Sequence, residues 1–198
     1  MVALLEQFLG RYVALSKDEL ELVSGMLEVR SCDRKLRLVD IGEQEMFINF
    51  VTSGLLRKYF VNGHDEIVKS LVQEGQFISS YVSFFNRTPS EYIIETIEPS
   101  TLVAISYDHL QQLFQIDAKW ERAVRLMMTD LLLEKENWLL DNYRFTPRER
   151  FLRFMQSRPE LLQRVPQKYL ASYLQMKPET FSRLKHLVGQ KKCVGTGI

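Results

Sequence analysis

The pattern of hydrophobic and polar residues changes its period twice along the chain. From residue 29 to residue 106 it alternates, in short runs rich in β-forming residues that are separated by glycine-containing turns. This pattern predicts strands at residues 35–39, 46–51, 55–61, 67–72, 92–98 and 101–105. Asn62-Gly63 between two of these runs predicts a hairpin with a type I′ turn, which needs positive φ at both central positions. Regularly spaced strands of this kind predict a sandwich or a barrel-like roll, and we expect an antiparallel β-roll similar to a jelly roll.

The two ends of the chain have helical patterns. Ser16 and Glu19 have the spacing of a capping box, which predicts a helix over residues 17–26. After the strands, the pattern predicts a short helix over 107–116 and a long one over 119–142, a stretch without glycine or proline. Thr146-Pro147 predicts the start of another helix, which ends near Ser157 because Pro159 follows. The predicted fold class is therefore α+β.

The long helix is apolar on two faces. One stripe has the alternating four-three spacing of a coiled coil and comprises Trp120, Val124, Met127, Leu131 and Trp138. A second stripe comprises Leu126, Leu133 and Leu140. We expect one face to pack on the roll and another on a second copy of the chain, with the first stripe as the dimer seam, because over-wide apolar faces mark interfaces. The alternative is a monomer in which one wide stripe packs on its own core.

Charge is divided unevenly between the two ends. Residues 145–198 have 11 Lys and Arg against 3 Asp and Glu, a net charge of +8. Residues 1–144 have 15 against 22, a net charge of −7, so the whole-chain value of +1 conceals an acidic body and a basic end. This asymmetry indicates a segment that binds a polyanion. The alternative is that the cations only solubilise a small helical domain.

The basic end has the pattern of a helix-turn-helix. A helix that begins at Pro166 is separated by residues 175–177 from a second helix that begins at Pro178. The side chains expected in the core between the two helices are Leu170, Leu174, Met176, Phe181 and Leu184, with the small Ala171 at the crossing. The turn usually has glycine where this chain has Gln175, so Gln175 must accept an unfavourable backbone conformation.

The second helix of such a motif enters the major groove of duplex DNA. On it, Arg183 can pair with guanine and Glu179 can accept a hydrogen bond from cytosine. The other side chains expected at the DNA, mainly at phosphates, are Gln167, Lys168, Thr180, Ser182, Lys185 and Lys191. We expect a β-roll sensor domain over residues 1–117, a dimerisation helix over 118–144 and a helix-turn-helix DNA-binding domain over 145–198.

The strings from Val165 to Leu174 and from Pro178 to Arg183, after a β-roll and a long helix, resemble the Crp/Fnr family of bacterial transcription regulators. The resemblance covers nearly the whole chain. It implies a roll of the cyclic-nucleotide-binding type, a homodimer joined along the long helix, a two-fold site on double-stranded DNA and RNA polymerase as a further partner. It also implies that Glu179 and Arg183 read bases. Many members end in a β-hairpin wing, which we expect to be short or absent because only residues 189–198 remain.

Members of that family that bind cyclic nucleotides use a loop with Gly-Glu near its start and Arg-Ser/Thr-Ala near its end. These positions fall here on residues 79–80 and 90–92, so the arginine that pairs with the cyclic phosphate is missing. Glu91 would repel the phosphate, and Arg87 is a substitute placed three residues early. We expect no cyclic AMP binding, and an unidentified small-molecule effector or none. The candidate effector pocket comprises Gly75, Phe77, Ser79, Ser80, Arg87, Ser90, Glu91 and Tyr92.

Other functional classes have little support in the sequence. Cys32 and Cys193 are too few for an iron–sulfur sensor, and we expect both to be free thiols in a reducing, cytoplasmic setting. No membrane span, metal-site spacing or activated nucleophile is visible, so we expect no membrane contact, no cofactor and no enzyme activity. Two alternatives remain. One is a metal-dependent β-barrel of the cupin type with an incidental basic tail, and the other is a protein-interaction module built on the long helix.

Overall fold

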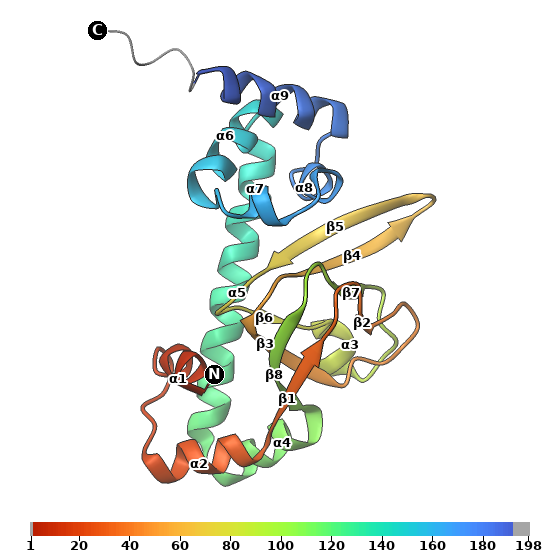
Figure 1. Cartoon of the computed structure of the whole chain (residues 1–198). Coiled ribbons are helices and arrows are strands. Elements are labelled where there is room, and N and C mark those ends of the chain that lie inside the picture. Colours follow the sequence, from red (N-terminus) through yellow and green to blue (C-terminus); the bar gives the residue numbers. More distant parts are fainter. Residues whose placement is uncertain (1, 192–198) are drawn as a thin grey trace, which may run out of the picture.

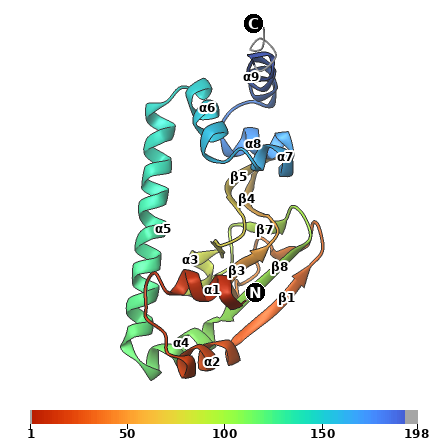
Figure 2. The same cartoon turned by 60° about the vertical axis from the view of Figure 1, so that its left-hand side comes forward.

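The computed structural model describes residues 2–191, with side chains from residue 4 to residue 186. The N-terminal part is a β-roll of two sheets, and one long helix, α5 (Ala118–Arg144), runs along its side (Figure 1). The C-terminal helices lie beyond one end of the roll, where α5 ends, as the rotated view also shows (Figure 2). The α+β fold class predicted from the sequence is confirmed.

Each sheet of the roll is antiparallel and has four strands within the described residues. The first sheet has the order β1 (Leu27–Cys32), β8 (Ser100–Ser106), β3 (Phe47–Ser53) and β6 (Phe77–Ile78). The second has the order β2 (Arg37–Val39), β7 (Ile93–Thr96), β4 (Leu56–Asn62) and β5 (Asp65–Val72). The buried side chains that pack together inside the roll are Cys32, Val39, Val51, Leu56, Val72, Ile78, Ile94 and Leu102. The six strands expected from the sequence are present, and β1 and β6 add to them.

The β4–β5 hairpin differs from its prediction by one residue. Asn62 pairs with Asp65, so the turn consists of Gly63 and His64 rather than Asn62 and Gly63. Of these two, Gly63 alone has a positive φ, of 62°, so the expected type I′ turn is wrong. The register is set by side chains far from the turn, such as Tyr59 opposite Val68, because a slip of one residue would move every side chain to the other face.

Helices α1 (Val2–Leu9), α2 (Lys17–Gly25), α3 (Tyr81–Asn86) and α4 (Tyr107–Ile116) surround the roll. The capping box predicted at the start of α2 is present: Ser16 N–H donates to the Glu19 carboxylate, and Glu19 N–H donates to Ser16 Oγ. The base of α5 packs on these helices, since Trp120 contacts a cluster that contains Val23 of α2 and Leu113 of α4.

The C-terminal part consists of α6 (Pro147–Ser157), α7 (Leu161–Arg164), α8 (Gln167–Tyr173) and α9 (Pro178–Lys191). Helix α8 lies against β5, the edge strand of its sheet. There Ser172 Oγ accepts from Val68 N–H and donates to the Glu66 carbonyl, both at 2.9 Å. The helix therefore covers backbone groups that an open sheet edge would leave unpaired.

The two apolar stripes of α5 differ in exposure from what the sequence predicts. Trp120 and Met127 of the coiled-coil stripe are 5% and 7% exposed, because they pack within their own chain. Leu133 and Leu140 of the second stripe are 54% and 43% exposed. The expected dimer seam is therefore wrong for Trp120 and Met127, whereas Val124, Leu131 and Trp138 are half-buried and stay a prediction.

The replacement Gly54→Ala is expected to destabilise the roll strongly. Gly54 has a φ of 106°, and a Cβ on it would lie 2.2 Å from Ser100 Oγ and 2.7 Å from Ser100 Cα. The clash with backbone and the positive φ together should lower the free energy of unfolding by about 3 kcal/mol. Denaturant unfolding at one fixed protein concentration measures the loss.

Gly63→Ala is the matched control for this experiment. Gly63 also has a positive φ, of 62°, but no atom lies within 4 Å of the Cβ that alanine would add. The expected loss is about 1 kcal/mol, which is the cost of the left-handed conformation alone. Equal losses for the two variants would contradict the importance of the close approach to Ser100.

Candidate nucleic-acid interface and internal cavity

Helices α8 and α9 form the helix-turn-helix arrangement predicted from the sequence. The side chains predicted for its core are buried or half-buried: Leu170, Ala171, Leu174, Met176, Phe181 and Leu184. These side chains join a larger cluster that includes Phe151 of α6 and Tyr59 of β4. Helix α9 is therefore held by α6, by α8 and, through α8, by the roll.

The turn between the two helices contains the strained residue that the sequence predicts. Gln175 has a φ of 52°, in the left-handed region. Arg150 of α6 holds this turn, because its guanidinium donates to the carbonyls of Leu174 and Gln175, each at 3.2 Å. The packing around the turn thus compensates for a residue that lacks the freedom of glycine.

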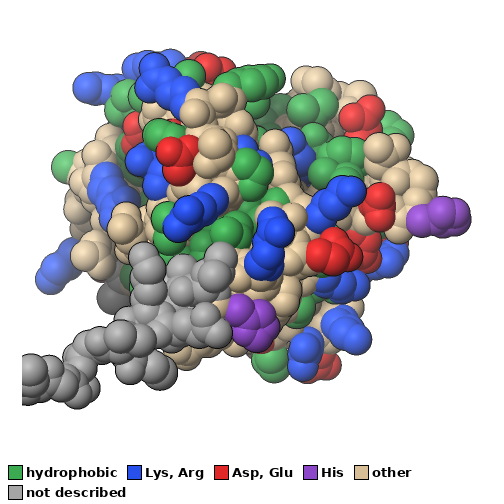
Figure 3. Space-filling view, turned by 90° about the horizontal axis from the view of Figure 1, so that it is seen from above, with side chains coloured by type: hydrophobic (Ala, Val, Ile, Leu, Met, Phe, Trp, Pro, Cys, Tyr) green, Lys and Arg blue, Asp and Glu red, His purple; other side chains and the backbone are tan. Residues whose placement is uncertain are grey.

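One side of α9 is free of contacts with the rest of the described chain. Glu179 and Arg183, four residues apart on the same helix face, are both exposed. Lys185 is exposed, and Thr180 and Ser182 are half-buried. Lys and Arg side chains lie at many places on this end of the molecule, with fewer acidic ones among them (Figure 3). The side chain of Lys191 and the expected wing lie outside the described residues.

Gln167 and Lys168, at the start of α8, are exposed beside the roll. Lys168 Nζ lies 3.7 Å from the Glu66 carboxylate of β5. An exposed ion pair of this kind contributes about 0–1 kcal/mol to stability. Lys168 could therefore leave Glu66 and bind a phosphate group with little loss of stability. The structure thus brings the sequence-predicted residues of α8 to the same end of the molecule as α9 (Figure 1).

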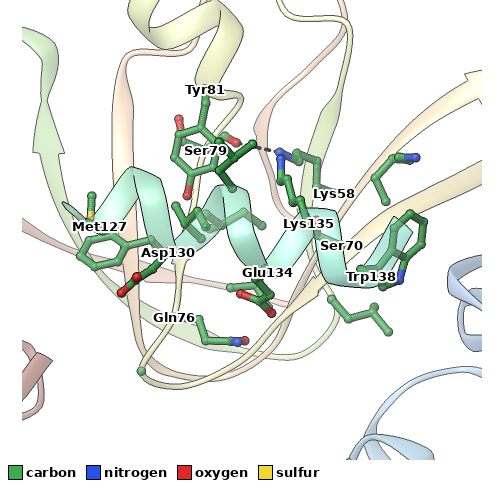
Figure 4. A pocket seen from close by; sticks show the side chains of 18 of the residues that line it. Lys58, Ser70, Gln76, Ser79, Tyr81, Met127, Asp130, Glu134, Lys135 and Trp138 are labelled. Carbon is green, nitrogen blue, oxygen red and sulfur yellow. Dashed lines mark hydrogen bonds between the residues drawn. The ribbon is translucent and has the colours of Figure 1, made fainter. Parts of the chain in front are cut away.

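A cavity of about 660 Å³ lies between the roll and α5. Its wall includes β4, β5, the segment that follows β6, and one face of α5 (Figure 4). The volume is within the range of sites that bind small molecules. Four residues of the candidate effector pocket line it: Gly75, Phe77, Ser79 and Tyr92.

The other four residues of that candidate pocket lie elsewhere. Ser80 and Ser90 are buried with their hydroxyl oxygens 2.8 Å apart and do not line the cavity. Arg87 places its guanidinium over the ring of Tyr107, 4.5 Å from the centroid, and Glu91 is exposed. These four residues do not line the cavity, so the expectation that they form one pocket with the other four does not hold for this cavity. Arg87 ends α3 in a left-handed conformation, φ 57°.

The cavity wall contains a group of lysines that the sequence did not predict. Lys58 of β4 is 6% exposed, and Lys69 of β5 and Lys135 of α5 also line the cavity. Burial, followed by repulsion from Lys135, lowers the pKa of Lys58 to about 7. The sequence does contain a signal for this feature, since Arg57-Lys58 places consecutive cations on opposite faces of one predicted strand.

The described residues were compared with the requirements of a metal site and of a membrane-spanning helix. Within them, no group of three or more His, Cys, Asp and Glu side chains could hold a metal ion. None of the helices in the part that the structure describes combines the length and apolarity needed to cross a membrane. His64 lies in the β4–β5 turn, Cys32 is a buried free thiol, and Cys193 lies outside the described residues.

No protein-family model matches this chain, and no curated protein matches its sequence. Solved structures do match it. FixK2 from Bradyrhizobium japonicum has a TM-score of 0.71 and 17% identity, over 87% of this chain and 89% of that chain. CLP from Xanthomonas campestris, a c-di-GMP-responsive global regulator, has a TM-score of 0.69 and 21% identity, over 90% and 94%. A protein from Eubacterium rectale assigned to the Crp/Fnr family of transcriptional regulators has a TM-score of 0.69 and 14% identity, over 89% and 85%.

This chain has the fold of the Crp/Fnr regulators. The resemblance that the helix-turn-helix strings indicate is thereby confirmed at the level of the fold. In this Crp/Fnr fold, the roll, the long helix and the helix-turn-helix follow one another as the sequence predicts. At 14–21% identity these structures share the fold of this chain, and they do not indicate which DNA sequence or which ligand it would bind.

The replacement Gln175→Gly is expected to stabilise the protein. Glycine adopts a φ of 52° without the steric cost that Gln175 bears. The free energy of unfolding should rise by about 0.5–1 kcal/mol, because the two backbone carbonyls bound by Arg150 are retained. Gln175→Ala is the control, since alanine keeps the strain, and it should give no such gain in denaturant unfolding. A stabilisation by alanine as large as that by glycine would show that the side chain, and not the backbone, is responsible.

Proposed function

We propose that this protein is a homodimeric, sequence-specific DNA-binding transcription regulator of the Crp/Fnr type that acts in the cytoplasm. The observation that carries the proposal is the free face of α9, where Glu179 and Arg183 are exposed one helical turn apart above a buried core. The role is regulatory and involves no catalysis. RNA polymerase is a further partner in this proposal.

Arg183 and Lys168 have different tasks in this proposal. Arg183 reads a base, because a guanidinium can pair with guanine through two hydrogen bonds. Lys168, at the start of α8, contacts a phosphate, which fixes the position of the protein without reading sequence. The phosphate replaces the Glu66 carboxylate, 3.7 Å from Lys168 Nζ in the structure.

Dimerisation, in this proposal, uses the outer face of α5. The exposed apolar side chains of this helix outside the cavity are Leu133, Leu140 and Tyr143, whereas Leu132 and Leu139 line the cavity. Exposed apolar side chains gathered on one helix are typical of an interface. Pairing with a second copy would cover it and place two α9 helices for the two halves of a two-fold site.

Arg183→Ala and Lys168→Ala are expected to change DNA binding in different ways. Duplexes selected by the wild-type protein from a random-sequence library provide the target. Arg183→Ala should lose about 1–3 kcal/mol of binding free energy and relax the preference at one base pair. Lys168→Ala should weaken binding to all sequences alike and reduce the slope of log K against log salt by about 1.

Lys17→Ala is the control for both variants, because Lys17 is an exposed cation on α2, at the far end of the molecule from α9 (Figure 1). It should leave both preference and salt slope unchanged. Identical behaviour of the Arg183 and Lys168 variants would contradict their assigned roles. A wild-type protein that selects no sequence and ignores duplex DNA in dilute buffer would overturn the proposed function.

The double replacement Leu133→Glu, Leu140→Glu is expected to separate the dimer. Both side chains are exposed in the single chain, so charges there cost the monomer little, whereas buried unpaired carboxylates would disrupt a dimer interface. Sedimentation velocity should show a dimer for the wild type and a monomer for the variant. Leu152→Glu on α6 is the control, since Leu152 is also exposed, and should remain dimeric. A monomeric wild type would refute this part of the proposal.

We also propose that cyclic AMP is not the effector. Ser90 lies within hydrogen-bond distance of Ser80 and of the Tyr92 carbonyl, and Arg87 is turned to Tyr107. The loop therefore presents no guanidinium to pair with a cyclic phosphate. Calorimetric titration with cyclic AMP is expected to give no binding in the micromolar range, and a micromolar dissociation constant would contradict this assignment.

A further inference from the structure

We propose that the cavity between the roll and α5 binds a small organic anion, an apolar molecule with a carboxylate or phosphate group, and that Lys58 and Lys135 bind its charge. This inference goes beyond the proposed DNA binding and does not depend on it. Four residues of the effector pocket expected from the sequence line the same cavity, and neither lysine was among the residues expected there.

The two lysines approach each other from different elements. Lys58 extends from β4 and Lys135 from α5, and their side chains point toward one another across the cavity (Figure 4). Tyr81 lies beside both, with its ring centroid 5.2 Å from Lys58 Nζ and 5.8 Å from Lys135 Nζ. Among residues 4–186, no carboxylate lies within 4 Å of either nitrogen. Two like charges thus face one cavity without a counter-ion from the described chain.

A β-bulge adds a third cation to the same wall. Lys58 is opposite Ser70 and Tyr59 is opposite Val68, which leaves Lys69 as an extra residue in β5. Lys69 lines the cavity, with its Nζ 5.2 Å from the centroid of the Trp138 ring on α5. Bulges redirect side chains and occur often beside binding sites. The irregularity of the hairpin therefore coincides with the cationic part of the cavity.

Polar groups around Lys58 have hydrogen-bonding capacity that the described residues leave unused. The Lys58 ammonium has three N–H donors and gives one to the Ser79 carbonyl at 3.1 Å. Ser79 Oγ and Tyr81 Oη are buried and have no hydrogen-bond partner. Buried polar groups without partners are rare in proteins. The oxygens of a carboxylate or phosphate would accept from the remaining N–H donors of Lys58.

Two acidic side chains at the cavity are paired with other residues of its wall, and a third is exposed. Asp130 accepts from the Tyr12 hydroxyl at 2.8 Å, and Glu134 pairs with Arg158 at 3.3 Å. Glu136, which also lines the cavity, is exposed. Much of the remaining wall is apolar and includes Leu71, Val72, Phe77, Leu131 and Leu139. This combination suits a ligand with one anionic group and an apolar body.

The affinity for an anion is expected to depend on pH through Lys58. Burial is the main cause that lowers its pKa to about 7, Lys135 and Lys69 lower it further, and Glu45 acts in the opposite direction. The Glu45 carboxylate accepts from the N–H groups of Phe47 and Ser80. Lys58 carries its charge below this pKa, so anion binding should weaken as pH rises through about 7.

The test uses a pair of fluorescent probes that differ in one charge. The first is 1-anilinonaphthalene-8-sulfonate, and the second is the neutral N-phenyl-1-naphthylamine, which has the same apolar body. Full-length wild type, Lys58→Met and Lys135→Met are titrated with both probes at about pH 6, where Lys58 is charged. Each replacement should weaken binding of the sulfonate about tenfold and leave the neutral probe nearly unchanged.

Controls keep the result independent of folding and of DNA binding. Lys135 is exposed, so Lys135→Met should not disturb the core even if Lys58→Met does. Lys17→Met removes an exposed cation outside the cavity and should change neither probe. Between about pH 6 and about pH 8 the wild type should lose affinity for the sulfonate, and Lys58→Met should not. The titrations contain no DNA, so their failure would leave the proposed function standing.

Competition then distinguishes the two kinds of acid. Benzoate and phenyl phosphate are each expected to displace the sulfonate probe from the wild type, and displacement by one alone would identify the preferred anionic group. Benzyl alcohol, their neutral analogue, should not displace it. The proposal is overturned if the lysine replacements weaken both probes equally or neither, or if no acid competes better than benzyl alcohol.

Discussion

The attachment of the C-terminal helices to the edge of the roll is the constraint on which the rest of the structure depends. Its centre is Arg57, which is 2% exposed and lies between the rings of Tyr59 and Tyr169, 3.8 Å from each centroid. The guanidinium is bonded to Glu66 at 2.7 Å and to Glu95 at 3.0 Å. Because the buried charge is paired and stacked from both sides, it orients the two parts instead of destabilising them.

The opposite charges of the two ends of the chain also form ion pairs with each other within the molecule. Arg164 of the basic end pairs with Glu74 and Glu98 of the roll, and Lys168 lies near Glu66. Part of the positive charge thus attracts the helix-turn-helix to the acidic body. Exposed cations on α9, among them Arg183, remain for a polyanion outside the chain. A net charge count cannot separate these two uses, because it contains no information on which charges are neighbours.

Helix α5 connects the cavity with the proposed dimer surface. Its inner face supplies Lys135 and Trp138 to the cavity, and its outer face presents Leu133 and Leu140. The same helix leads into the C-terminal helices, and β5, which forms another wall of the cavity, is bonded to α8 through Ser172. A ligand that bridges Lys58 of β4 and Lys135 of α5 would therefore join the β4–β5 hairpin to the long helix, and these are the elements that position the helix-turn-helix.

Local patterns in the sequence determined the elements themselves. The alternation of polar and apolar residues predicted the strands, and capping residues such as Ser16 and Thr146 predicted the helix starts. The spacing from Leu170 to Leu184 predicted the core of the helix-turn-helix. These features were predictable because they depend on residues close together in the chain. The strained turn at Gln175 was predictable for the same reason.

The tertiary structure decided which partner each element meets. It set the β4–β5 register one residue away from the Asn-Gly turn, and it buried Trp120 within the chain. It turned Arg87 away from the cavity and brought Lys58 and Lys135 to it. These outcomes depend on packing between segments far apart in sequence, and periodicity identifies an apolar or charged face without specifying what that face contacts.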